Sequence, residues 1–214
     1  MKNEYYIIGA GGFAKEVFFL TQEVLGETSL FKGFIDHDSR KTYLNVQEKK
    51  MPIISEDIFL SKINPALNVH LFIGVGDVKI LEKVSRKFSM YQFPNLIHPN
   101  FIGDKLSIQL EKGNIIAAGC VFTIDIKIGS FNVFNLNTTV GHDTVIGNCN
   151  VFNPGTNISG SIKIGNRNLF GTNSTVLQLI EIKDDNILGA SSLITKNVGN
   201  KNIMVGVPAK NLIK

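Results

Sequence analysis

The sequence of 214 residues contains no tryptophan, only two cysteines and no long apolar run. Cys120 and Cys149 belong neither to a C-x-x-C motif nor to a cluster with the spacing of metal ligands, which argues against a zinc site and a disulfide framework. Apolar runs such as Tyr5–Ala10 are far shorter than the roughly 20 residues of a membrane-spanning helix. We therefore expect a cytoplasmic protein with reduced thiols and without a metal, a signal peptide or a membrane partner.

Charged residues are also scarce, at 19%, and they leave a formal net charge of +4. The lysines are scattered along the chain, which favours a solvated surface over a groove for nucleic acid. A mildly basic balance suits anionic small ligands such as nucleotides or coenzyme A. Apolar residues reach 43%, enough for a packed core, so the composition argues against a disordered chain.

A strict period of six residues runs through the second half of the chain. Every sixth position from Leu110 to Ile194 is Ile, Leu, Val or Phe. Neither an α-helix nor an alternating strand produces this pattern. We interpret each hexad as one short strand and one corner, so that three hexads make a coil of 18 residues. The next position is often glycine: Gly129, Gly141, Gly147, Gly165, Gly171 and Gly189.

The period predicts a triangular parallel β-helix. The large apolar side chain of each hexad would fill the inside, and residues 18 apart would stack at roughly the 4.8 Å spacing of paired strands. The run of hexads gives about five coils and a height of about 24 Å. We expect Gly, Asn and Asp to provide the positive φ that tight corners need. Ile102 and Gly103 lie out of phase, which predicts an irregular first coil.

Strand and helix patterns alternate in the first hundred residues. Buried strands are expected at Tyr5–Ile8, Phe31–Asp36 and Leu71–Val75, with helices after the first and the last of them. This order predicts a small, Rossmann-like α/β domain with a parallel sheet. We expect this domain to span residues 1–99 and the β-helix, with a short C-terminal tail, to span residues 100–214.

A glycine-rich loop with the pattern G-x-G-x-x-A follows the first strand, from Gly9 to Ala14. Its glycines would let backbone N–H groups approach a phosphate at a helix N-terminus. We expect a nucleotide held by its phosphates rather than a nicotinamide cofactor, because the β-helix offers no hydride chemistry. A glycine-rich turn without a ligand is the alternative. The candidate nucleotide-binding residues are Gly9, Gly11, Gly12, Asp36, Gly74, Gly76 and Asp77.

Five segments together resemble the hexapeptide-repeat acetyltransferases that act on nucleotide-linked amino sugars, a family similar to the sialic acid O-acetyltransferases. The segments are Ile7–Glu16, Gly74–Asp77, Gly141–Asp143, Asn153–Gly155 and Val205–Lys210. The resemblance covers nearly the whole chain. It implies a left-handed β-helix, acetyl-CoA as co-substrate, and a homotrimer with the active site between neighbouring prisms. It also implies that the N-terminal domain holds an NDP-amino sugar, which we expect to carry UDP or dTDP.

The resemblance places the chemistry at Gly-His-Asp. His142 lies near a corner of its coil and points outward, and its imidazole would take a proton from the attacking amine. Asp143 would fix the tautomer of that ring, or is a plain turn residue. Gly160, one coil further on, would donate a backbone N–H to the oxyanion, or is glycine only because the corner requires it. Val151 stands where many relatives have a second histidine, so that contact is lost or replaced.

Coenzyme A would lie between prisms, towards the C-terminal coils. The candidate contacts are Gly171, Gly189, Ala190, Lys196, Pro208 and Lys210. The leading function is acetyl-CoA-dependent N-acetylation of a nucleotide-linked 4-amino-4,6-dideoxy sugar, for O-antigen (lipopolysaccharide) or other surface glycan synthesis. Two alternatives stay open. One is O-acetylation of a sugar hydroxyl, of the sialic acid type, and the other is a scaffold that binds a nucleotide sugar without chemistry.

Overall fold

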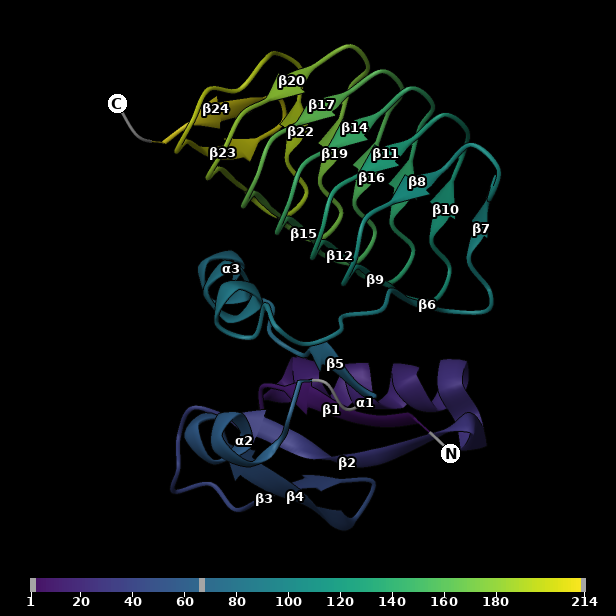
Figure 1. Ribbon diagram of the computed structural model, residues 1–214. Helices are drawn as coiled ribbons and strands as arrows, with labels where there is room; N and C mark the ends of the chain where they lie inside the picture. Colours follow the sequence, from purple (N-terminus) through teal and green to yellow (C-terminus); the bar gives the residue numbers. More distant parts are fainter. Residues whose placement is uncertain (1–2, 66–67, 213–214) are drawn as a thin grey trace.

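The computed structural model describes residues 3–65 and 68–212 and contains a small α/β domain beneath a long solenoid (Figure 1). The sheet of the α/β domain has the strand order β3-β4-β2-β1-β5, in which only β3 runs antiparallel to its neighbour. Its strands are β1 (Asn3–Ile8), β2 (Ser29–Asp36), β3 (Tyr43–Val46), β4 (Lys49–Ser55) and β5 (Val69–Ile73). Its helices are α1 (Gly12–Leu25), the 3₁₀ turn η1 (Gly26–Thr28), α2 (Glu56–Lys62) and α3 (Val78–Lys87).

Alternating residues of β1 supply two hydrophobic clusters, one on each side of the sheet. Tyr5 and Ile7 pack with residues of α1, whereas Tyr6 and Ile8 pack with residues of α2 and α3. This is the period of two that a strand buried on both faces requires. The expected Rossmann-like domain is confirmed, with helices on both faces of a mostly parallel sheet.

The second half of the chain is a left-handed parallel β-helix, as expected, with three parallel sheets. The sheet nearest the α/β domain, here called the domain-facing sheet, contains β6 (Leu96–Ile97), β9 (Ile115–Ile116), β12 (Val133–Phe134), β15 (Val151–Phe152), β18 (Leu169–Phe170) and β21 (Ile187–Leu188). The hairpin of β23 (Ile203–Gly206) and β24 (Ala209–Asn211) extends it. The division into domains after residue 99 stays a proposal, since β6 already pairs with β9.

Two further sheets complete the prism. The second sheet contains β7 (Ile102–Gly103), β10 (Val121–Phe122), β13 (Thr139–Val140), β16 (Asn157–Ile158), β19 (Thr175–Val176) and β22 (Leu193–Ile194). The third sheet contains β8 (Gln109–Leu110), β11 (Lys127–Ile128), β14 (Val145–Ile146), β17 (Lys163–Ile164) and β20 (Glu181–Ile182).

Three vertices join these sheets, and each is named here after one of its residues. The Ala118 vertex joins the domain-facing sheet to the second sheet, and the His142 vertex joins the second sheet to the third. The Phe131 vertex joins the third sheet to the domain-facing sheet, at the start of the next coil. In a triangular prism the His142 vertex is therefore opposite the sheet that packs on the α/β domain.

The residues at every sixth position fill the inside of the prism. From Ile116 to Ile194 each is at most 4% exposed, and Leu110 at the start is partly buried. Three phenylalanines on successive coils, Phe134, Phe152 and Phe170, stack with ring centroids 4.6 and 4.4 Å apart. The pairs Ile97–Ile116 and Gly103–Phe122 are one residue longer than the regular offset of 18, which confirms an irregular first coil.

Every corner of the regular coils contains one residue with positive φ, three positions after the inward residue. These are Gly113, Gly119, Asp125, Phe131, Asn137, Asp143, Cys149, Gly155, Ser161, Arg167, Asn173, Leu179, Asp185 and Ser191. The recurrent glycine directly after each strand has a different role from the one we expected. At Gly141, for example, φ is not positive, but a β-carbon would lie 2.6 Å from the backbone nitrogen of Gly160 on the next coil. Close approach of successive coils therefore explains this glycine.

The α/β domain docks against the solenoid through the edge of its sheet at β5, with α1 and α3 on either side (Figure 1). Leu96 and Ile115 of the domain-facing sheet extend the hydrophobic cluster of α1. Val133 and Val151 extend the cluster of α3. Within the part of the chain that the structure describes, no helix has both the length and the apolar character to span a bilayer.

Candidate functional site

His142 and Asp143 form a hydrogen-bonded pair on the solenoid surface. Strand β13 ends at Val140, and the chain then turns the corner with Asp143 at a φ of 57°. The Nδ1 atom of His142 lies 2.7 Å from a carboxylate oxygen of Asp143, and both side chains are about 60% exposed. Asp143 is thus both the turn residue and a hydrogen-bond partner. A proton on Nδ1 shared with this carboxylate leaves Nε2 with a free lone pair, as a base requires.

Gly160 lies directly beside the imidazole, on the next coil. The backbone N–H of Ser161 donates to the carbonyl oxygen of His142 at 2.7 Å, which keeps the two coils in register. The N–H of Gly160 donates to no acceptor within the described residues. At the Phe131 vertex the equivalent N–H groups are taken by side chains, for example that of Asn148 by Asn166 at 2.8 Å. The amide at Gly160 is therefore available to a ligand.

The glycines of the α/β domain lie where parallel strands end and the strand order reverses, on either side of β1. This is the edge at which open α/β sheets bind ligands. A β-carbon on Gly9 would lie 2.7 Å from the carbonyl oxygen of Gly74, and one on Gly74 would meet Ala14 at 2.7 Å. Gly9 and Gly74 are therefore required by packing.

Gly11, Gly12 and Gly76 face open space instead. Gly11 is the N-cap of α1 and provides no side-chain hydrogen bond, and the first turn of this helix has no acidic residue. The N–H groups at the start of α1 thus lack a side-chain cap, which suits a phosphate. The N-terminus of α3 differs, because the Asp77 carboxylate accepts from Lys79 and Ile80 at 2.9 and 3.0 Å. Asp77 therefore caps α3.

Asp36 ends β2 at the same edge but is already engaged. It is 5% exposed and accepts hydrogen bonds from the backbone N–H of Asp38 at 2.9 Å and from the Lys41 ammonium group at 3.2 Å. The sequence pattern did not point to Lys41. Its partly exposed ammonium group adds positive charge at the edge where the phosphates would bind.

The candidate coenzyme contacts lie at two different vertices of one prism. Lys196 follows β22 at the His142 vertex, two coils beyond Gly160. The other contacts belong to the Ala118 vertex or to the β23–β24 hairpin at the end of the domain-facing sheet: Gly171, Gly189, Ala190, Pro208 and Lys210. A single chain does not bring these two groups together, because the width of the prism separates them.

A cleft of about 460 Å³ lies between α1 and the Ala118 vertex. Its walls are largely apolar, with Phe13 and Val17 from α1 and Ala117 from the solenoid, and His98 and Asn135 add polar groups. Neither His98 nor Asn135 was singled out from the sequence, because the cleft joins segments that are distant in the chain. Val151, where we expected a histidine contact to be lost or replaced, is 1% exposed and packs in the hydrophobic cluster that includes residues of α2 and α3.

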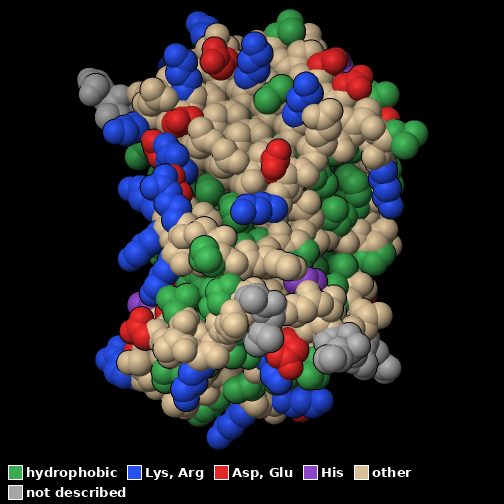
Figure 2. All heavy atoms as spheres, viewed as in Figure 1, with side chains coloured by type: hydrophobic (Ala, Val, Ile, Leu, Met, Phe, Trp, Pro, Cys, Tyr) green, Lys and Arg blue, Asp and Glu red, His purple; other side chains and the backbone are tan. Residues whose placement is uncertain are grey.

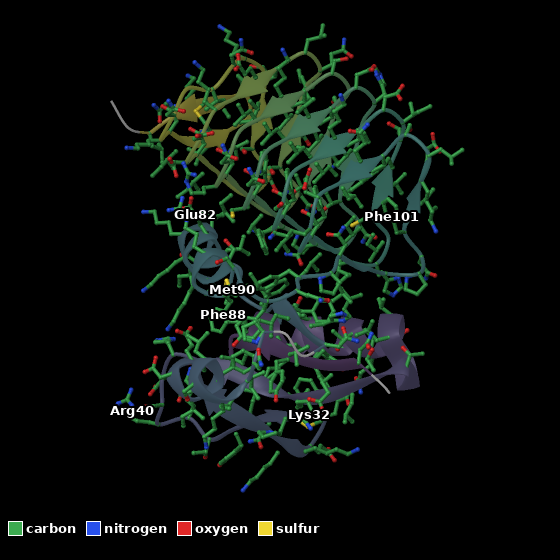
Figure 3. The ribbon with its side chains drawn as sticks, viewed as in Figure 1. Lys32, Arg40, Glu82, Phe88, Met90 and Phe101 are labelled. Carbon is green, nitrogen blue, oxygen red and sulfur yellow. The ribbon has the colours of Figure 1, made fainter. Side chains whose placement is uncertain are left out.

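A second cleft, of about 490 Å³, lies between α3 and the last coils, lined by Lys79, Arg167 and Lys201 among others. Figure 2 shows Lys and Arg side chains along this edge of the molecule, on the left of the view. In Figure 3, Glu82 projects from α3 towards the solenoid, where its carboxylate pairs with the Arg167 guanidinium at 3.3 Å. Among the described residues, no group of three His, Cys, Asp or Glu side chains could hold a metal ion.

An α/β domain with an open, glycine-rich edge, joined to a hexapeptide β-helix that presents a His–Asp pair, fits the class of hexapeptide-repeat acyltransferases. The comparisons agree with this class. Residues 4–88 match the family described as the PglD N-terminal domain. No curated protein sequence matches the chain. Together with the fold, this match supports a hexapeptide-repeat nucleotide-sugar acetyltransferase, and the chain is similar to the following solved structures.

A histidine-to-asparagine variant of perosamine N-acetyltransferase from Caulobacter crescentus, in complex with CoA and GDP-perosamine, is 25% identical, with a TM-score of 0.87, over 97% of this chain and 96% of that chain. WeeI from Acinetobacter baumannii is 26% identical, with a TM-score of 0.85, over 97% of this chain and 99% of that chain. The acetyltransferase domain of PglB from Neisseria gonorrhoeae, in complex with acetyl coenzyme A, is 24% identical and shares the fold, with a TM-score of 0.86 over 99% and 100% of the two chains.

Proposed function

We propose that this protein transfers the acetyl group of acetyl-CoA to the amine of a nucleotide-linked 4-amino-4,6-dideoxy sugar, for the synthesis of a surface glycan such as lipopolysaccharide O-antigen. The observation that carries the proposal is the 2.7 Å contact between His142 and Asp143 beside the free amide of Gly160. The perosamine N-acetyltransferase structures, which hold CoA and GDP-perosamine, support both the donor and an amino-sugar acceptor.

The proposed chemistry needs one base and one oxyanion donor. As the neutral sugar amine attacks the thioester carbonyl, Nε2 of His142 takes the proton that the nitrogen loses. Asp143 stabilises the imidazolium that forms, and the N–H of Gly160 donates to the oxyanion. When the carbon–sulfur bond breaks, the imidazolium returns its proton to the departing thiolate. The products are the amide and the free thiol of CoA, and His142 is again neutral.

The arrangement of the vertices supports an active site shared between copies. The nucleotide edge belongs to the α/β domain, whereas the His142 vertex is on the opposite side of the prism from that domain. In addition, CoA could contact both His142 and Ala190 only by lying between two prisms. A contact from the His142 vertex of one copy to the Ala118 vertex of the next is heterologous, and three such contacts close a ring of triangular prisms. We therefore propose a homotrimer.

The test is incubation with acetyl-CoA and the GDP-, UDP- and dTDP-linked 4-amino-4,6-dideoxy sugars, with release of the CoA thiol followed over time. The perosamine relatives make GDP a necessary member of this panel, although we expected UDP or dTDP from the sequence. Stability of the product to mild alkali separates an amide from the ester that an O-acetyltransferase would form. Turnover of none of the three, with CoA still bound, would favour the scaffold interpretation.

Substitutions of His142 and Asp143 test the role of each residue in the reaction. His142→Asn should lower kcat by at least about 10²-fold, the range for loss of a general base. Asp143→Asn should lower it too, because an amide stabilises an imidazolium less well. Asp125→Asn is the matched control, since Asp125 occupies the equivalent corner one coil earlier, also with positive φ. Activity of His142→Asn at the wild-type rate would remove His142 from this role.

A further inference from the structure

The corner positions with positive φ favour residues that tolerate this conformation. Of the fourteen corners from Gly113 to Ser191, ten contain Gly, Asn, Asp or Ser. Left-handed backbone places the β-carbon of other L-residues against the following carbonyl oxygen, which costs free energy. The exceptions are Phe131, Cys149, Arg167 and Leu179. Each of these four calls for a compensating contact.

Three of the exceptions have such a contact in the same chain. All three lie at the Phe131 vertex and face the α/β domain. Phe131 packs edge-to-face on Phe93 with centroids 5.1 Å apart, and Cys149 is 5% exposed in the cluster that includes residues of α3. Arg167 pairs with Glu82 of α3 and with Asp185. Domain docking therefore compensates the unfavourable backbone at these corners.

Leu179 is the fourth exception and has no such contact. Its side chain is 74% exposed, and no hydrophobic cluster of the described residues includes it. It lies at the His142 vertex, one coil beyond Gly160, and its N–H donates to the carbonyl oxygen of Gly160 at 3.2 Å. Leu177, two residues earlier, is also exposed, at 42%. An apolar corner beside the candidate oxyanion donor is therefore explained by a contact from outside this chain rather than by the fold.

The residues along the His142 vertex indicate which ligand contacts Leu179. Positions 18 apart place His142, Gly160, Gln178 and Lys196 in one column. Lys196 is exposed and has no ion pair among the described residues, and it stands three coils from His142, about 14 Å at the usual strand spacing. In the other direction the column continues to Ile124, which is apolar. A donor with its acetyl group at His142 therefore finds an apolar surface at Leu179 and then a cation for its phosphates at Lys196.

We propose that Leu179, supported by Leu177, contacts the pantetheine arm of the acyl-CoA donor and sets its affinity. The inference rests on the proposed function, because that function places the thioester between His142 and Gly160. Leu179 would be a binding residue that leaves the proton transfers untouched. The positive φ of Leu179 costs free energy in the unbound protein. Contact between its side chain and the donor offsets this cost in the complex.

Leu179→Asn tests the proposal, because asparagine suits the backbone but removes the apolar surface. We expect Kd for CoA, measured by calorimetry on the assembled protein, and KM for acetyl-CoA to rise about five- to tenfold. kcat and KM for the amino sugar should stay at the wild-type values, and Tm should stay equal or rise. Leu179→Gly should behave in the same way. Asp125→Asn, at the same vertex but away from the donor path, is the control and should leave Kd for CoA unchanged.

S-Acetylpantetheine, which lacks the nucleotide and its phosphates, locates the contact on the donor. The defect of Leu179→Asn should persist with this donor, whereas that of Lys196→Met should vanish. An unchanged Kd for CoA in Leu179→Asn overturns the proposal. A variant that dissociates in size-exclusion chromatography also overturns it and assigns Leu179 to contact between copies. If the wild-type protein binds CoA but acetylates no amino sugar, the proposed function fails while the calorimetric result on Leu179 still decides this contact.

Discussion

The imidazole of His142 occupies the space that a side chain on Gly160 of the next coil would need. A β-carbon on Gly160 would lie 2.5 Å from Nε2 and 2.7 Å from Cε1 of that ring, closer than packed atoms approach. Glycine at position 160 therefore allows the ring to lie beside the backbone amide of the next coil. This gives Gly160 a reason to be glycine that corner geometry does not supply, because its φ is not positive.

Gly160→Ala should displace the His142 ring and lower kcat/KM by at least about 10²-fold, the size of effect seen when a base or an oxyanion donor is lost. Tm should change little, because the His142 side chain is mostly exposed and can swing into solvent. Gly199→Ala is the control: a β-carbon there meets only the Asn202 side chain, at 3.4 Å. Wild-type kinetics of Gly160→Ala, measured by thiol release, would show that the contact between ring and glycine is not required.

The period of six was sufficient to predict the prism, its inward residues and the vertex that presents His142. It could not reveal the reason for the glycines. A spacing fixes which residues stack, but not whether a position is limited by its φ, as at Gly113, or by an approaching coil, as at Gly141. The separation of Gly160 from Gly171 onto different vertices was contained in the sequence, since they follow Ile158 and Phe170, which are two hexads apart in a coil of three.

Other features depended on contacts between distant segments. Glu82 and Arg167 are 85 positions apart, and no periodicity relates a helix of one domain to a corner of the other. The role of Asp77 was open to prediction, because Asp before a helical pattern is a common N-cap. The hydrogen bonding of Asp36 was harder to predict. Lys41 donates to its carboxylate from a loop whose shape follows no repeat.

The two thiols should resist modification in the folded protein. Burial raises the pKa of Cys120 and of Cys149 to about 11, from an ordinary 9.0. The folded state therefore holds these protons more tightly than the unfolded state does. The resulting stability is complete below about pH 9 and is lost as the pH rises from about 9 to about 11.

Iodoacetamide at pH 8 should label neither cysteine in the native protein and both after unfolding in guanidinium chloride, as mass spectrometry would show. The free energy of unfolding should also fall across that alkaline window. Cys149→Ala, which removes one of the two titrating groups, should make this fall shallower. Rapid labelling of either thiol in the native state would contradict the burial seen at these positions.

The ion pair between Arg167 and Glu82 should hold the α/β domain in its orientation on the solenoid. Arg167→Met leaves Glu82 and Asp185 without their partner, so we expect a loss of about 1–3 kcal/mol in unfolding free energy, the range for buried or partly buried charged hydrogen bonds. Arg167 also lowers the pKa of the Asp185 carboxyl. The stability that comes from the Asp185 carboxylate is present above about pH 4. It is lost as the pH falls through the lowered pKa of this group. Urea unfolding at pH 7 and at pH 3 measures both effects.

Arg40→Met is the matched control for this prediction. Arg40 also forms a bidentate contact with a carboxylate, that of Asp38, but its side chain is 89% exposed. Solvent screens such a pair, so Tm should stay at the wild-type value. If the two variants lost equal stability, the docking role of Arg167 would be wrong. KM for the nucleotide sugar should rise only in the Arg167 variant, because the proposed function assigns the binding of that substrate to the α/β domain.

Phe152→Ala should be the most destabilising of these changes. Phe152 is fully buried between Phe134 and Phe170, and its ring lies within 16° of parallel to both. Removal of a buried phenylalanine side chain costs about 3–5 kcal/mol, because the cavity adds to the lost transfer free energy. In a solenoid each coil is stabilised mainly by its two neighbours, so this loss weakens two interfaces at once. Leu110→Ala, at the partly buried first hexad, should cost less in the same denaturation assay, and an equal cost would mean that the coils do not stabilise one another through this stack.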